Sequence, residues 1–198
     1  MSDLVIVDSG VANLASITGA FRRLGVAAQV TADPASVRRA RRVVLPGVGA
    51  FGPGMAALTT NGLDGAIRDA VSAETPLLGV CLGMQLLCEA SEEAPGTPGL
   101  GVIAGTCRLL PSDVRIPHLG WNSVIAEPGA RSVANGVAAF AHSYALRESP
   151  REWAPAWTTH GARFVAALER GPLLACQFHP ELSGDLRLHQ RFLEEVVA

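Results

Sequence analysis

Short apolar runs alternate with amphipathic, helix-like stretches through the first half of the chain. A short apolar run is typical of a buried strand, and apolar residues spaced three or four apart are typical of a helix. Their alternation predicts a parallel sheet with helices on both faces and ligands at the carboxyl ends of its strands. The predicted strands are 4–7, 26–31, 43–45 and a run from Leu77, and the predicted helices are 14–24, a short one from Asp33-Pro34, and 54–71 with a break at 61–62.

After residue 90 the pattern changes to short β-like pieces separated by loops rich in Gly and Pro. Such pieces are typical of antiparallel strands. We expect them to be antiparallel additions to the parallel core, so that residues 1–198 form one domain. The pieces are 102–103, 106–110, 122–125, 137–142 and 164–168, followed by a last strand at 173–178 and a closing helix at 185–197.

The composition is that of a globular protein with a substantial core. The chain has 198 residues, of which 48% are hydrophobic and 17% charged, and its formal net charge is -2. So small a charge favours no nucleic acid or anionic membrane as a partner. The first apolar run is too short for a signal peptide or a membrane span, so we expect a cytoplasmic protein. The one basic run, 38–42, is typical of a solvated helix end rather than a phosphate-binding patch.

The four cysteines show no metal-binding or disulfide pattern. Cys81, Cys88, Cys107 and Cys176 form no C-x-x-C pair and have no zinc-like spacing with histidine. We therefore expect no metal, and we expect Cys88 and Cys107 to be core residues.

Cys81 lies where an apolar strand turns into a helix, between Gly79 and Gly83. This is the pattern of a nucleophile elbow, with Cys in place of Ser. A helix start favours the reactive thiolate, and the backbone N–H of Leu82 would face a developing oxyanion. The alternative is that Cys81 is one more buried small hydrophobic residue. The G-x-C-x-G match by itself does not decide between the two.

A second candidate loop, 46–52, follows the third predicted strand and contains three glycines. Its backbone N–H groups could face a ligand or an oxyanion, although an ordinary strand-to-helix turn has a similar composition. It does not match a dinucleotide-binding fingerprint.

The last apolar strand ends in His179-Pro180-Glu181. Residues two apart on an extended segment face the same way, so Glu181 can orient His179 as an acid or base for a cysteine nucleophile. The alternative is a surface His and a solvated Glu. We expect His160 and His189 to be exposed, because their sequence contexts are polar.

The stretches 79–85 and 177–181 together resemble the class I glutamine amidotransferases. That family carries a Cys-His-Glu triad on a flavodoxin-like α/β fold. The resemblance implies the same fold here, a mostly parallel central sheet flanked by helices with antiparallel β additions in the second half, and it implies no cofactor.

Three further stretches, 45–51, 116–122 and 142–144, resemble the glutaminase subunit of imidazole glycerol phosphate synthase. The Pro-His-x-Gly-Trp-Asn motif at 117–122 is the most discriminating of them, and the resemblance covers essentially the whole chain. It implies a subunit that hydrolyses glutamine and passes ammonia to a cyclase (β/α)8-barrel partner in a heterodimer. The cyclase would then form imidazole glycerol phosphate and an aminoimidazole carboxamide ribotide in histidine biosynthesis.

The resemblance also implies roles for individual residues. Cys81 would be the nucleophile, His179 the acid and base, and Glu181 the orienting carboxylate. The remaining implied positions are Gly47, Val48, Gly49 and Leu82 at the oxyanion, Gln85, Glu93, His142, Ser143 and Tyr144 at the glutamine site, and Asn13, His118 and Trp121 at the partner interface.

Three other readings remain open at this point, and one loop departs from the family pattern. The chain could be a glutaminase of another class I system, a stand-alone cysteine hydrolase or peptidase, or a non-catalytic regulatory subunit on the same scaffold. The loop 8–13 differs from the commoner family form, which has an aromatic residue after the Asp and a Gly before the Asn, although Asn13 is retained. This difference concerns partner contact more than the triad.

Overall fold

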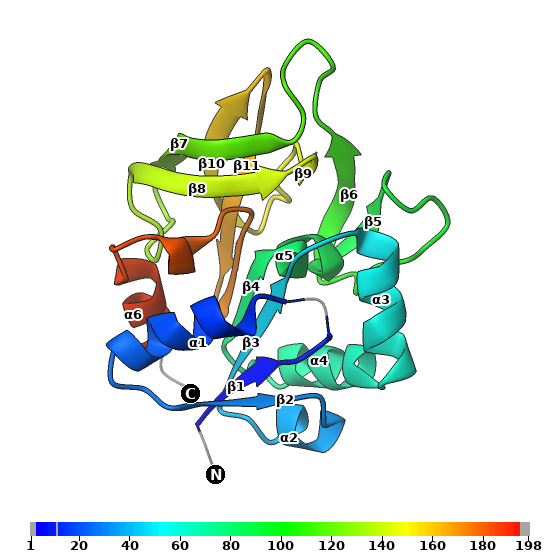
Figure 1. Ribbon diagram of the computed structural model, residues 1–198, viewed down its shortest axis with the longest axis vertical. Coiled ribbons are helices and arrows are strands. Elements are labelled where there is room, and N and C mark those ends of the chain that lie inside the picture. Colours follow the sequence, from blue (N-terminus) through cyan, green and yellow to red (C-terminus); the bar gives the residue numbers. More distant parts are fainter. Residues whose placement is uncertain (1–2, 11, 195–198) are drawn as a thin grey trace.

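A central nine-stranded sheet runs through the whole molecule (Figure 1). The computed structural model describes residues 3–10 and 12–194. The strand order is β2-β1-β3-β4-β12-β11-β10-β7-β8, and the pairs from β2 to β12 are parallel whereas those from β12 to β8 are antiparallel. The strands are β1 Leu4–Val7, β2 Ala28–Thr31, β3 Arg42–Gly47, β4 Leu77–Cys81, β7 His118–Ala126, β8 Gly136–His142, β10 Ala154–His160, β11 Ala162–Arg170 and β12 Leu173–Cys176.

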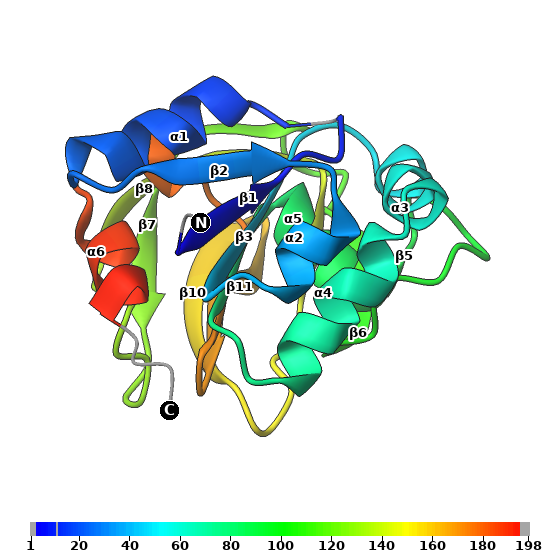
Figure 2. The same ribbon diagram turned by 90° about the horizontal axis from the view of Figure 1, so that it is seen from below.

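Helices cover both faces of the parallel half of this sheet (Figure 2). Because side chains alternate along a strand, Val5 and Val7 of β1 pack on one face whereas Leu4 and Ile6 pack on the other. Both sets are buried, which explains why these strands are apolar without alternation. On one face lie α1 Leu14–Arg23 and α6 Arg187–Glu194, and on the other lie α2 Pro34–Arg38, α3 Phe51–Thr60, α4 Leu63–Ser72 and α5 Leu82–Leu87.

The second half of the chain extends the sheet and adds a small one. Strands β11, β10, β7 and β8 continue the central sheet in antiparallel fashion, so the predicted antiparallel addition is confirmed for 122–125, 137–142 and 164–168. A separate three-stranded sheet has the order β5-β6-β9, with β5 Cys88–Ser91, β6 Ile103–Leu109 and β9 Tyr144–Leu146. The prediction is wrong for 102–103 and 106–110, because β6 lies outside the central sheet and pairs in parallel with β5.

Several element boundaries differ from those predicted. β3 continues through Pro46 to Gly47, and α3 begins at Phe51 rather than at Gly54. The predicted break between two helices is real, since Gly62 has φ of 66°, a left-handed conformation that suits glycine. β12 ends at Cys176 rather than at residue 178, and β5, β9 and β10 were not predicted. Val11 and the predicted end of the closing helix lie outside the described residues.

The prediction for His189 was wrong. This side chain is fully buried in α6 and packs edge-on against Phe21 of α1, with ring centroids 5.1 Å apart. The polar residues near it in sequence lie on the outer face of the helix, whereas Leu188, His189 and Phe192 form its buried inner face. Burial lowers the pKa of His189 to about 4.

No helix within residues 3–10 and 12–194 has the length and apolar character needed to cross a bilayer.

Candidate active site

Cys81 ends β4 and immediately precedes α5. Cys81 has φ of 54° and ψ of −111°. A positive φ is strained for a residue other than glycine, and such strained residues often occur at functional sites. Around it, β3 and α5 approach so closely that a Cβ on Gly83 would lie 1.9 Å from the carbonyl oxygen of Leu45. The predicted strand-to-helix elbow is therefore present, and Gly83 is required for it.

His179 reaches this elbow from the next strand of the sheet. β12 pairs in parallel with β4, with Cys176 opposite Val80, so the segment after β12 runs alongside Cys81. The backbone N–H of His179 donates to the carbonyl of Ala139 in β8 at 2.8 Å, which fixes the segment at the junction of the parallel and antiparallel halves. The pairing of β12 with β4 and this hydrogen bond thus bring together residues nearly a hundred positions apart in sequence.

The structure brings the side chains of Glu181 and His179 together. The Nδ1 atom of His179 lies 2.8 Å from Oε1 of Glu181, and both side chains are buried. Burial by itself lowers the pKa of the His179 imidazole, but hydrogen bonds to the Cys81 sulfur and to Glu181, together with their negative charges, outweigh it and raise the pKa to about 10. The surroundings of His179 therefore favour its protonated imidazolium form.

A pocket of about 300 Å³ opens in front of Cys81 and His179. Eight further positions that the sequence singled out line it, so residues from five separate segments come together. These are Val48, Gly49, Leu82, Gln85, Glu93, His142, Ser143 and Tyr144.

Gly47 does not line this pocket. Gly47 packs instead against the start of α5, where a Cβ on it would be 2.9 Å from Cβ of Leu82. Pro117 and Ala141 line the pocket but were not predicted as site residues. Pro117 could have been predicted as a site residue, because it begins the Pro-His-x-Gly-Trp-Asn motif. Ala141 has no polar group from which the sequence could have predicted a role in the site.

Glu93 connects the pocket to the start of α3. Its Oε2 atom accepts a hydrogen bond from the backbone N–H of Phe51 at 2.7 Å. A carboxylate at this helix N-terminus also meets the positive end of the helix dipole. Phe51 belongs to the glycine-rich loop 46–52, so this hydrogen bond joins Glu93 to that loop, and Glu93 lines the same pocket as Cys81.

The three residues expected at a partner interface differ in exposure. Asn13 is exposed and caps α1, with its Oδ1 accepting from the N–H of Ser16 at 3.3 Å. Trp121 of β7 is 59% exposed. His118, however, is only 4% exposed and points inward, so it cannot itself offer surface to a partner. Successive residues of β7 face opposite sides of the sheet in turn. Because His118 and Trp121 are three positions apart, they lie on opposite faces.

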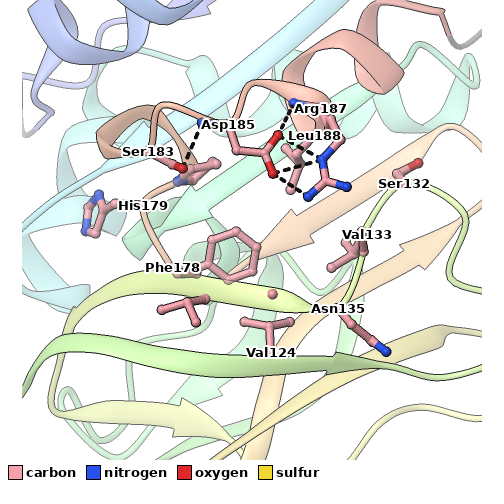
Figure 3. Close-up of a pocket in the computed structure, with 15 residues that line it drawn as sticks. Val124, Ser132, Val133, Asn135, Phe178, His179, Ser183, Asp185, Arg187 and Leu188 are labelled. Atoms are coloured by element: carbon pink, nitrogen blue, oxygen red, sulfur yellow. Dashed lines mark hydrogen bonds and ion pairs between the residues drawn. The ribbon is translucent and has the colours of Figure 1, made fainter.

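A second cavity of about 150 Å³ lies between β8 and α6 (Figure 3). The ion pair of Asp185 and Arg187 lies at its side, with atoms as close as 2.5 Å. His179 belongs to the residues around both cavities, but Figure 3 shows its ring turned away from this one. The reactive groups therefore face the first pocket.

The part of the chain that the structure describes contains no group of three or more His, Cys, Asp or Glu side chains arranged to hold a metal ion.

The chain is similar to known proteins of one family over nearly its whole length. The family model "Glutamine amidotransferase class-I" matches residues 5–196. Imidazole glycerol phosphate synthase subunit HisH of Symbiobacterium thermophilum is 44% identical over 188 residues, covering 93% of this chain and 89% of that protein. The same subunit of Methanopyrus kandleri is 43% identical over 198 residues, covering 98% and 96%.

Solved structures show the same fold at lower identity. A crystal structure of a glutamine amidotransferase superimposes with a TM-score of 0.80 at 22% identity, covering 96% of this chain and 97% of the other. PurLQS from Thermotoga maritima superimposes with a TM-score of 0.76 at 16% identity, covering 98% and 99%.

Proposed function

The chain belongs to the class I glutamine amidotransferase family, and we propose that it is the glutaminase subunit of imidazole glycerol phosphate synthase. In this role it hydrolyses glutamine to glutamate and ammonia. The ammonia passes to the cyclase subunit, which forms imidazole glycerol phosphate and an aminoimidazole carboxamide ribotide in histidine biosynthesis. The whole chain acts as one domain.

One observation carries the proposal, namely the meeting of the Cys81 elbow and the His179–Glu181 pair at one pocket. The thiolate attacks the side-chain carbonyl carbon of glutamine and forms a C–S bond. His179 then gives its proton to the departing nitrogen, so that ammonia leaves and a γ-glutamyl thioester remains. Water attacks the thioester, His179 takes up a proton from that water, and the C–S bond breaks to give glutamate and the thiolate.

The negative oxygen of each tetrahedral intermediate needs donors beside Cys81. The backbone N–H of Leu82, at the start of α5, is one candidate, and the loop Gly47–Gly49 is the other source. A single such donor contributes about 3–4 kcal/mol to transition-state stabilisation in related hydrolases.

Other polar groups in the lining of the pocket suit the amino-acid end of glutamine. The Glu93 carboxylate, already bound to the N–H of Phe51, has a second oxygen that can accept from an α-ammonium. Ser143 and Tyr144 also line the pocket.

The proposed partner is the cyclase (β/α)8-barrel subunit, bound as a heterodimer over the mouth of the pocket. Exposed apolar side chains support such an interface, since Trp121 is 59% exposed and its β7 neighbour Leu119 is 72% exposed. Asn13 belongs to the same proposed interface, whereas the buried His118 would support the interface without contacting the partner.

The four cysteines are unpaired, which agrees with a reducing compartment such as the cytoplasm, where we place the reaction.

The test is glutamate release from glutamine by the purified chain, alone and with its cognate cyclase subunit and that subunit's nucleotide ligand. Strong stimulation in the mixture supports both the activity and the partner. Equal release in both samples would keep a glutaminase but reject the partner, and no release in either would reject the proposed function.

A further inference from the structure

Two buried histidines, His118 and His142, lie beside the pocket in surroundings that favour the neutral imidazole. Burial lowers the pKa of His118 to about 4 and that of His142 to about 3, with smaller contributions from neighbouring imidazoles. Each ring is therefore neutral and carries one N–H donor and one bare nitrogen acceptor.

The partners of these rings fix which nitrogen carries the proton. His142 Nδ1 lies 3.0 Å from the carbonyl oxygen of Tyr144, which can only accept, so Nδ1 is the donor and Nε2 the acceptor. His118 Nδ1 lies 3.4 Å from that Nε2 and must donate to it. The remaining nitrogen of His118 is then an acceptor, and it faces the amide nitrogen of Asn122, a donor, at 3.3 Å.

The three hydrogen bonds thus run in one direction, from Asn122 on β7 to Tyr144 at the pocket. The ring of His118 is also held between two others. Phe140 stacks on it with centroids 4.9 Å apart, and His160 stacks on it at 4.2 Å. Because flat stacking restrains rotation of the ring, His118 is held in the orientation that the hydrogen bonds require.

The carbonyl of Tyr144 passes this constraint to Gln85. The amide nitrogen of Gln85 donates to that carbonyl at 2.9 Å and to Oε1 of Gln177 at 3.0 Å. Both amide hydrogens are therefore engaged, and the backbone carbonyl determines which end of the amide is nitrogen. The oxygen of Gln85 is left as the acceptor available to the pocket that this residue lines.

We infer that His118 and His142 are positioning residues, a one-way hydrogen-bond relay that, through the Tyr144 carbonyl, holds Gln85 with its oxygen toward the substrate. The oxygen would accept from an N–H of glutamine, and in this respect the inference rests on the proposed function. Neither histidine needs to touch the substrate in this role.

A matched pair of variants tests the relay kinetically. In His142→Asn the amide nitrogen lies near the position of Nδ1 and can still donate to Tyr144, whereas His142→Leu has no donor. We expect His142→Leu to raise KM for glutamine about tenfold, the effect of one lost hydrogen bond, with little change in kcat. His142→Asn should recover most of the affinity. Equal KM values for the two variants, whether raised or not, would overturn the positioning role.

A second measurement needs no variant and no activity. In protein labelled with ¹⁵N-histidine at about pH 8, the ¹⁵N shifts should report the Nδ1–H tautomer for both His118 and His142. His160 provides an internal control, because its Nε2 faces the carbonyl of Arg115 at 2.8 Å and should give the opposite tautomer. An Nε2–H tautomer at His118 or His142 would overturn the relay. A wild-type chain that releases no glutamate would instead reject the proposed function, while the tautomers would still decide the relay.

Discussion

The amide nitrogen of Gln177 lies 3.8 Å from the sulfur of Cys81, although 96 positions separate the two residues in sequence. The contact follows from the parallel pairing of β12 with β4, in which Cys176 lies opposite Val80. The next residue along each strand is therefore Gln177 or Cys81, and His179 follows two positions later. One register of one strand pair thus places the nucleophile, an amide donor and the imidazole together.

Replacing the nucleophile should abolish the proposed reaction. We expect Cys81→Ala to lower glutamate release by at least about 1,000-fold, since no other thiol lines the pocket. Release is measured from glutamine by a coupled glutamate assay. Cys107→Ala is the control, because Cys107 is buried in β6 and does not line the pocket. This variant should keep its activity within a few-fold of the wild type. An active Cys81→Ala enzyme would contradict the mechanism.

The Glu181 carboxylate should govern the titration of His179. Contact with Cys81 and Glu181 raises the pKa of His179 to about 10, so Glu181→Gln should shift this titration to lower pH. The imidazole ¹³C shift measured by NMR from pH 6 to 11 reports it directly. We also expect about a 100-fold loss of glutamate release, milder than for the nucleophile. An unchanged titration would show that Glu181 does not stabilise the imidazolium.

The same raised pKa makes a prediction about stability. A group whose folded-state pKa is raised stabilises the fold fully below its ordinary pKa, and loses that contribution as the pH rises through the folded value. For His179 the ordinary value is 6.5 and the folded value about 10. The free energy of unfolding of the wild type, relative to Glu181→Gln, should therefore fall between about pH 6.5 and pH 10 in urea titrations. A difference that grows over this range would be inconsistent with the assigned shift.

Two glycine substitutions in helices should have opposite effects. In Gly83→Ala the new Cβ would lie 1.9 Å from the carbonyl oxygen of Leu45, so β3 and α5 must move apart. We expect a loss of about 3 kcal/mol or more in the free energy of unfolding, together with a loss of activity. In Gly19→Ala, within α1, the Cβ meets no atom within 4 Å, and we expect a gain of about 0.5–1 kcal/mol. Urea unfolding of both variants checks this, and a stable Gly83→Ala protein would show that the elbow tolerates a side chain.

Trp121 should contribute to binding of the cyclase subunit but not to the fold of this chain. Because its side chain is 59% exposed, Trp121→Ala should leave the unfolding curve nearly unchanged. Loss of an aromatic anchor at an interface costs about 2 kcal/mol, so the Kd for the cyclase should rise about 30-fold in calorimetry. Val30→Ala is the control, since Val30 is 40% exposed on β2, at the opposite edge of the sheet from β8. Equal Kd values for Trp121→Ala and the wild type would exclude Trp121 from the interface.

Much of the fold could be predicted because its signals are local. The period of apolar residues marks strands and helices one by one, and glycines around Cys81 mark a sharp turn. Strand β9, with only three residues, is too short to produce a periodic signal, and β10 contains Pro155 within a mixed sequence. These strands form because neighbouring strands supply hydrogen-bond partners, which a local pattern does not reveal.

The sequence by itself determined the order of the elements, the elbow at Cys81 and the pairing of His179 with Glu181, since each depends on residues close together in the chain. Only the tertiary structure decided which side chains are buried and which partners they contact. It buried His189 under α1 and turned His118 inward to join a relay toward Gln85. The reason is that burial and hydrogen bonding of a side chain depend on strand order and packing across the whole sheet, and not on the residues beside it in sequence.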